Sequence, residues 1–244
     1  MVPAAGRPGE VTAAHPHLRV ERSPRGYRCL LLDRPARHNA VGPDLARALR
    51  DAFAAEPADV VLLASADPRV FCSGADLALS DAERAEVSGL FYDCLEIMIT
   101  RPGPVIAAVG GPAVAGGAQL VVAADLRVAG PAARFRWTGP PGLDLAVGAW
   151  VLPDLVGRGR ATELAMTGRW VGAAEALATG LVNRVEDEPL PAAADLAADL
   201  AGRAPGSLAR VKMITAAGGL LDRLHAESEA NRAAWDRALG TGPP

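Results

Sequence analysis

Short apolar runs alternate with helix-like segments over the first two thirds of the chain. Residues 28–33, 60–64 and 105–109 form continuous apolar runs of strand length, and 126–128 is a shorter candidate of the same kind. Pro43 and Asp44 open a segment whose apolar residues recur with helical spacing. Because strands buried on both faces are typical of parallel sheets, the pattern predicts an α/β protein built from β-α units.

The pattern changes after residue 158, where helix-like segments follow one another between glycines and prolines. We expect a disordered leader over 1–17, a β-α core over 18–190 and a helical region over 191–244. The leader lacks the apolar centre of a signal peptide. No internal repeat or low-complexity linker divides the chain.

Composition narrows the class of function. Half of the 244 residues are hydrophobic, which is enough for a sizeable core, and the net charge of −3 gives no reason to expect nucleic acid or an anionic membrane as partner. No apolar run reaches the ~18 residues of a membrane helix. The cysteines Cys29, Cys72 and Cys94 fit no metal-ligand spacing and no disulfide framework. We therefore expect a cytoplasmic protein without a metal.

Two glycine-bearing loops follow predicted strands, which is where ligands bind in such sheets. One is FCSGAD at 71–76, and the other is GGPAVAGGAQL at 110–120. If a helix begins at Gly116, its first N–H groups lack intrahelical acceptors and suit a carbonyl oxygen that becomes negative during a reaction. Gly117 keeps the approach clear. Close packing of the helix on the sheet also favours glycine, so the spacing leaves both interpretations open. No Lys-Ser/Thr pair follows, which excludes a P-loop.

Ser73 has two possible roles. Its backbone N–H, with Gly74 allowing the turn, is a candidate second donor of an oxyanion hole. A nucleophilic Ser73 needs a histidine base, and no motif links it to any of His15, His17, His38 or His225.

Five segments in order resemble the crotonase (enoyl-CoA hydratase/isomerase) superfamily over residues 18–215. They are LDRPARHNAV, VFCSGADL, VIAAVGGPAVAGGAQLVVAADLRVA, LVGRGRATELAMTGRWVGAAEALATGLVNRV and LARVKMI. The resemblance implies an α/β fold with a ββα spiral core and a C-terminal helical trimerisation region. It also implies a homotrimer or dimer of trimers, a role in fatty acid metabolism, and a coenzyme A thioester as ligand with no other cofactor. The thioester oxygen would sit between the N–H groups of Ser73 and Gly116.

The resemblance also implies where coenzyme A lies. Contacts are expected from Ala36, Arg37, His38, Ala40, Phe71 and Ala75, and the substrate-binding set further includes Gly74, Asp76, Gly117, Gln119, Trp137 and Leu143. Lys212 is the only lysine, so arginines must supply most phosphate contacts. For Arg37, a phosphate contact and a solvated loop position are both open.

The chain departs from the hydratases it resembles at both catalytic glutamates. The first falls three residues after the oxyanion glycine, where this chain has Gln119, which orients water but takes up no proton at neutral pH. The second falls on Trp137, Thr138 or Gly139, depending on the alignment gap. Asp144 is the carboxylate left nearby, either as a catalytic group or as a loop residue. Trp137 either packs against an acyl chain or fills the core.

Two hypotheses from different classes follow. The first is a hydratase-, isomerase- or lyase-type enzyme with a changed acid/base set that includes Asp144. The second is a non-catalytic acyl-CoA binder or carrier that retains the oxyanion hole. Because function resides in the site and not in the fold, the resemblance does not decide between them.

Overall fold

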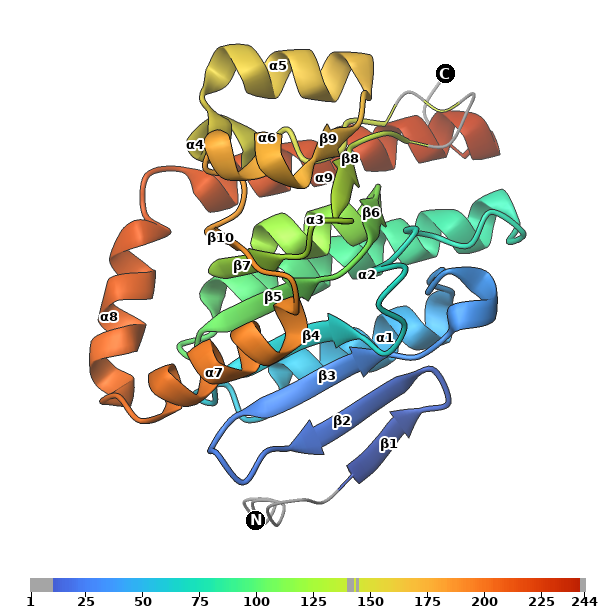
Figure 1. Ribbon diagram of the computed structural model, residues 1–244. Coiled ribbons are helices and arrows are strands. Elements are labelled where there is room, and N and C mark those ends of the chain that lie inside the picture. The colour runs from blue at the N-terminus through green and yellow to red at the C-terminus, as the bar shows by residue number, and fades with distance from the viewer. Residues whose placement is uncertain (1–10, 140–142, 144, 242–244) are drawn as a thin grey trace.

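A mixed sheet forms the centre of the protein, and the computed structural model describes residues 11–139, 143 and 145–241. Within these residues the sheet has seven strands in the order β1-β2-β3-β4-β5-β7-β10 (Figure 1). Strand β2 is antiparallel to its neighbours β1 and β3, and β3, β4, β5, β7 and β10 run parallel to one another. The strands are β1 (Val11–His15), β2 (Leu18–Arg22), β3 (Arg28–Leu32), β4 (Val61–Ser65), β5 (Val105–Val109), β7 (Leu126–Ala129) and β10 (Arg184–Val185).

The central parallel strands are mostly apolar because helices cover both faces of the sheet. Side chains alternate along a strand, so Leu63 of β4 packs with the helices on one face and Leu62 packs against the other. The first face carries α1 (Pro43–Ala54), α2 (Asp81–Thr100) and α3 (Gly116–Ala123), and α7 (Pro189–Ala201) lies on the second (Figure 1). The predicted parallel β-α units and the predicted helix start at Pro43 are confirmed.

The two glycine-bearing loops lie side by side. The strand β6 (Pro112–Val114) follows β5 and leads into α3, and it forms a small sheet with β8 (Arg134–Arg136) and β9 (Val171–Gly172). An isolated bridge pairs Cys72 with Ala113, and Val114 N–H donates to the Cys72 carbonyl oxygen at 2.9 Å. The loop after β4 is thereby fixed against the strand that precedes α3.

The C-terminal part is helical, as expected. It comprises α4 (Leu152–Val156), α5 (Arg158–Thr167), α6 (Ala173–Ala178), α7, α8 (Pro205–Thr215) and α9 (Leu220–Leu239). The expected boundary at 190/191 falls inside α7, which packs on the central sheet. The long helix α9 instead packs along α2 (Figure 1). None of the described helices has the length and apolarity needed to cross a bilayer.

The structure differs from the expected disordered leader at Val11–His15. These residues form β1 and pair with β2 in an antiparallel register, from Val11 opposite Glu21 to His15 opposite Leu18. The prediction of disorder is wrong for this part of 1–17. An antiparallel strand at the edge of a sheet is held by pairing with its neighbour, and its sequence need not contain a continuous apolar run. Residues 1–10 lie outside the described residues.

Candidate functional site

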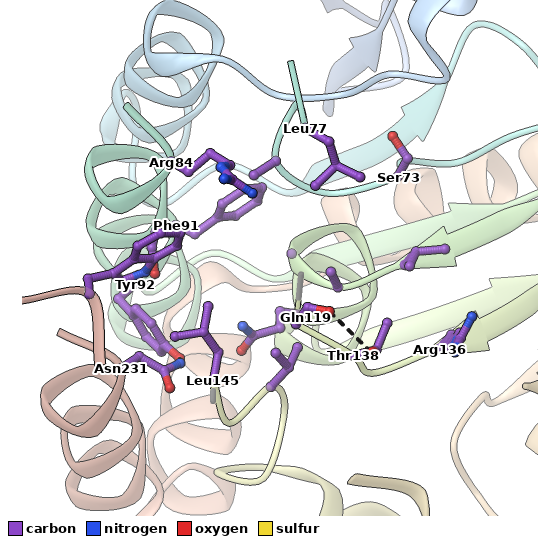
Figure 2. A pocket seen from close by; sticks show the side chains of 18 residues that line it. Ser73, Leu77, Arg84, Phe91, Tyr92, Gln119, Arg136, Thr138, Leu145 and Asn231 are labelled. Atoms are coloured by element: carbon purple, nitrogen blue, oxygen red, sulfur yellow. Dashed lines mark hydrogen bonds between the residues drawn. The ribbon is translucent and has the colours of Figure 1, made fainter. Parts of the chain in front are cut away.

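A cavity of about 280 Å³ opens between α2, the start of α3, the segment after β8 and α9 (Figure 2). Most of its described wall is apolar or backbone: Ala75, Leu77, Phe91, Val114, Ala115, Gly116, Gly139, Leu145, Val147 and Trp235. The polar side chains on it are those of Ser73, Arg84, Ser88, Tyr92, Gln119, Arg136, Thr138 and Asn231. None of these described lining residues carries a carboxylate. The cavity joins the two loops that the sequence singled out.

Both glycines at the start of α3 are needed for packing. A Cβ on Gly117 would lie 2.2 Å from the Cys72 carbonyl oxygen, and one on Gly116 would lie 2.7 Å from Cζ of Phe91. Ala115, just before the helix, has a positive φ of 50°, which turns the chain into the helix. Gly116 also lines the cavity. Close packing is therefore a real reason for these glycines, and Gly116 faces the cavity as well.

Free backbone N–H groups lie on this wall at Gly116 and Ala75. Gly116 is the first residue of α3, and its N–H has no acceptor among the described residues. Ala75 N–H also lacks an acceptor among them. A Cβ on Gly74 would lie only 3.2 Å from Gly116 N, so the two loops touch at this point. The cavity wall thus offers a pair of unpaired donors from neighbouring loops.

Ser73 needs a correction, because its N–H is already engaged. It donates to the His38 carbonyl oxygen at 3.1 Å, which leaves Ala75 and not Ser73 as the donor on this loop. The Ser73 side chain lines the cavity, but in the described part of the chain no hydrogen bond joins it to a histidine ring. A serine nucleophile with a histidine base therefore has no support in this geometry.

Gln119 lies one turn into α3 and is held by Trp150. It is 5% exposed, and its Oε1 accepts a hydrogen bond of 2.8 Å from Trp150 Nε1. An indole N–H is only a donor, so this contact determines which end of the amide is the oxygen. The Gln119 side chain therefore presents its NH₂ group, a donor, to the rest of the cavity (Figure 2).

The segment expected to carry the second glutamate, residues 137–139, lies partly in the hydrophobic core and partly on the wall of the cavity. Trp137 is 1% exposed, stacks on Phe135 with ring centroids 6.3 Å apart and does not line the cavity, so it fills the core. Its predicted substrate contact is wrong. Thr138 and Gly139 do line the cavity, whereas Leu143 does not. Asp144 lies outside the described residues.

A buried polar cluster behind Gln119 was not predicted. Tyr92 of α2 lines the cavity and donates its hydroxyl proton to Glu227 Oε1 of α9 at 2.9 Å, while Asn231 Nδ2 donates to the Tyr92 oxygen at 2.7 Å. Glu227 also accepts N–H bonds from Gly148 at 3.0 Å and from Trp150 at 3.1 Å. No local signal joins residues 135 positions apart. The cluster ties α9 to α2 and to the loop before α4, and Figure 2 shows two of its members, Tyr92 and Asn231.

Burial is the largest influence on the pKa values of Glu227 and Tyr92 in this cluster. It raises the pKa of Glu227, although the hydrogen bonds from Tyr92 and from the backbone of Gly148 and Trp150 oppose it. Burial also raises the pKa of Tyr92, and the nearby Glu227 carboxylate adds to the effect. Tyr92 is therefore a neutral phenol at physiological pH.

The loop expected to hold coenzyme A is anchored by Asn39 and Asp76. Asn39, which the sequence did not single out, is buried with φ 53°; its Nδ2 donates to the Phe71 carbonyl oxygen at 2.8 Å. Asp76 accepts hydrogen bonds of 3.0 Å from both Arg34 and Arg37. Burial alone would raise the pKa of Asp76, but bonds from Ala78 N–H and the two arginines hold it below its ordinary value.

The predicted coenzyme A contacts differ in exposure. Three of them are exposed and lie in or just after the 3₁₀ turn η1 (Pro35–Arg37): Ala36, Arg37 and His38. Ala40 and Phe71 are buried in the core. The N–H of Phe71 donates to the Pro112 carbonyl oxygen and its carbonyl oxygen accepts from Asn39, so the predicted ligand contact of Phe71 has no support in this geometry.

Comparisons with known proteins agree with this architecture. The family model described as enoyl-CoA hydratase/isomerase matches residues 26–238. A putative enoyl-CoA hydratase from Thermus thermophilus is 36% identical over 229 residues, covering 86% of this chain and 89% of the relative.

Solved structures give the same result. An enoyl-CoA hydratase from Bacillus anthracis has a TM-score of 0.75 at 28% identity, covering 92% of this chain and 94% of the other. A monofunctional enoyl-CoA isomerase from M. smegmatis has a TM-score of 0.70 at 30% identity, covering 89% and 98%. The predicted crotonase fold is confirmed, and the chain belongs to the enoyl-CoA hydratase/isomerase family of the crotonase superfamily.

Proposed function

We propose that this protein binds an acyl-CoA thioester with the carbonyl oxygen between the N–H groups of Gly116 and Ala75. The observation that carries the proposal is the pair of unpaired N–H groups where the two loops touch. The start of α3 adds the positive end of a helix dipole on the same side. Together these donors stabilise negative charge on a thioester oxygen.

Gln119 argues against ordinary hydration at this site. Hydration needs a group that removes a proton from water, and the Gln119 amide offers the cavity a donor in place of a carboxylate. Thr138 and Gly139, which line the cavity where the second glutamate is expected, provide no carboxylate either. Losing one positioned proton-transfer group costs typically about 10²–10⁴-fold in rate, and here both are missing.

The second candidate, a non-catalytic acyl-CoA binder, is favoured by the lack of a carboxylate among the described lining residues. A family isomerase or lyase that uses Asp144 is the catalytic alternative. It requires the Asp144 carboxylate to reach the reacting carbons directly or through one water. Both share the thioester site proposed above.

The proposed position of coenzyme A and the proposed assembly are those that the resemblance to the family implies. The exposed turn at Ala36, Arg37 and His38 is the proposed place for the nucleotide end of coenzyme A. A homotrimer or dimer of trimers is the proposed assembly, and the exposed Val211, Met213 and Ile214 of α8 give it an apolar surface. Light scattering coupled to gel filtration tests that assembly.

Calorimetric titration tests the thioester site. Because backbone donors are hard to remove by mutation, the ligand is changed instead: butyryl-CoA is compared with S-butyl-CoA, a thioether that lacks the carbonyl oxygen. Two hydrogen bonds to the oxygen predict about tenfold tighter binding of the thioester. Equal affinities contradict the proposed position of the carbonyl, and absence of binding by both contradicts acyl-CoA binding itself.

Hydration is tested separately with crotonyl-CoA. We expect turnover at least about 10²-fold below that of a two-glutamate family hydratase in the same assay. A comparable rate would show that the missing glutamates have been replaced by another acid/base pair.

A further inference from the structure

Arg84 is, with Arg136, one of two arginines on the described wall of a cavity that is mostly apolar. It lies in the first turn of α2, whose N-terminus is fixed by a capping box between Ser80 and Glu83. Figure 2 shows its side chain extending from α2 past Phe91 toward Leu77. Because the helix start is fixed, the backbone position from which this side chain extends is fixed as well.

The Arg84 side chain is held in place by its neighbours. Its Nη2 pairs with Asp81 one turn earlier in α2, and its guanidinium carbon lies 6.0 Å from the ring centroid of Trp235 on α9. The side chain is only 20% exposed. An arginine held from both sides loses little conformational freedom when it binds a ligand.

Arg84 still has donors to offer. Its Nε is shielded from solvent and has no hydrogen-bond partner among the described residues. A guanidinium carries five N–H donors in a fixed fork, and Asp81 engages only one of its nitrogens. Leaving a buried donor without an acceptor is unfavourable, so an incoming acceptor would be stabilised here.

The surroundings of Arg84 suit an anionic ligand group. Ser88, one turn further along α2, also lines the cavity and adds a hydroxyl donor. No carboxylate is found among the described lining residues. Leu77, Phe91 and Trp235 provide an apolar wall for the methylene groups of an acyl chain.

We propose that the cavity takes acyl-CoA thioesters whose acyl chain ends in a carboxylate, bound by Arg84 and Ser88. The ligand is thus a mono-thioester of a dicarboxylic acid. The proposal rests on the proposed thioester site, because the Gly116 and Ala75 donors would hold the other end of the same acyl group. A carboxylate accepts two parallel N–H bonds from a guanidinium, which a methyl-ended chain cannot do.

Calorimetry with matched ligand pairs tests this substrate class. Succinyl-, glutaryl- and adipyl-CoA are each compared with the methyl-ended acyl-CoA of equal carbon number. We expect at least one dicarboxylic thioester to bind about tenfold or more tightly than its partner, as hydrogen bonds to a charged group predict. In Arg84→Met, which keeps the length and loses the charge, the preference should disappear while the methyl-ended ligand still binds.

Arg50→Met is the matched control, because Arg50 is on α1, pairs with Asp51 and does not line the cavity. It should keep the preference. If no dicarboxylic thioester exceeds its partner, or if Arg84→Met keeps the preference, the carboxylate proposal is overturned while acyl-CoA binding stands. If the preference is lost equally in Arg50→Met, it reflects net charge and the proposal also fails. If neither ligand of any pair binds, the proposed function itself fails.

Discussion

Trp150 Nε1 donates a hydrogen bond of 2.8 Å to Gln119 Oε1 at the wall of the cavity. At the position where the sequence resemblance predicts the first hydratase glutamate, this contact leaves an amide that presents a donor to the cavity. The same tryptophan donates its backbone N–H to Glu227, so one residue orients the amide and the buried carboxylate. The proposed loss of hydratase chemistry thus rests on the packing around Gln119 as well as on its side-chain type.

Restoring both carboxylates should restore hydration. A carboxylate at 119 can still accept the Trp150 N–H with one oxygen and face the cavity with the other. A side chain at Gly139 enters the cavity, and its Cβ would lie 3.2 Å from Leu145 Cβ, which requires a shift of a few tenths of an ångström. The double variant Gln119→Glu, Gly139→Glu should hydrate crotonyl-CoA at least about tenfold faster than the wild type.

Each single variant is the control for that pair. Because hydration uses both groups, neither alone should reach the rate of the double variant. A melting curve for each protein shows whether a low rate reflects loss of fold. If the folded double variant is no faster than the wild type, the glutamate replacements do not explain the lack of hydration.

Glu227 should make stability depend on pH. Its pKa in the folded protein lies above the ordinary value of 4.5, because burial outweighs its hydrogen bonds. The folded state therefore binds this proton more tightly than the unfolded state does. The resulting contribution to the free energy of unfolding is fully present below about pH 4.5 and is lost as pH rises through the folded pKa.

Urea unfolding between pH 4.5 and 8 measures this effect. The difference in unfolding free energy between the wild type and Glu227→Gln should fall as pH rises. Glu229→Gln, at an exposed position on the same helix, is the matched control for removing one carboxylate. A wild-type advantage over Glu227→Gln that stays constant or grows with pH would refute the assignment.

The two glycines Gly117 and Gly89 should respond oppositely to alanine. A Cβ at 117 meets the Cys72 backbone oxygen at 2.2 Å, and backbone cannot move aside cheaply, so Gly117→Ala should lose about 1–3 kcal/mol of stability or more. Gly89 is inside α2 with nothing within 4 Å, so Gly89→Ala should gain about 0.5–1 kcal/mol. Thermal unfolding of the two variants compares them; a stable Gly117→Ala protein would contradict the close approach of the loops.

The main layers of the fold could be predicted because the burial pattern is local. A continuous apolar run such as that of β5 indicates a strand covered on both faces, and it can be recognised without knowing which helices cover it. β1 could not be predicted in this way, because it is defined by pairing with β2 and not by its own pattern.

The site was predicted less completely, for a related reason. Gly116 and Gln119 were identified from a contiguous motif. The choice between Ser73 and Ala75 depends on whether the Ser73 N–H already donates to the His38 carbonyl oxygen, a contact between two loops that no local pattern indicates. The Tyr92–Glu227 contact is a tertiary pairing between two helices that no spacing rule indicates.

The most direct measurement of the central claim is the infrared stretching frequency of a thioester carbonyl, using butyryl-CoA with ¹³C at the carbonyl, free in water and bound to the protein. If Gly116 and Ala75 both donate to the oxygen, the bond is polarised and the frequency should fall below its value in water. A frequency equal to or above that in water would place the carbonyl away from the two donors and contradict the account.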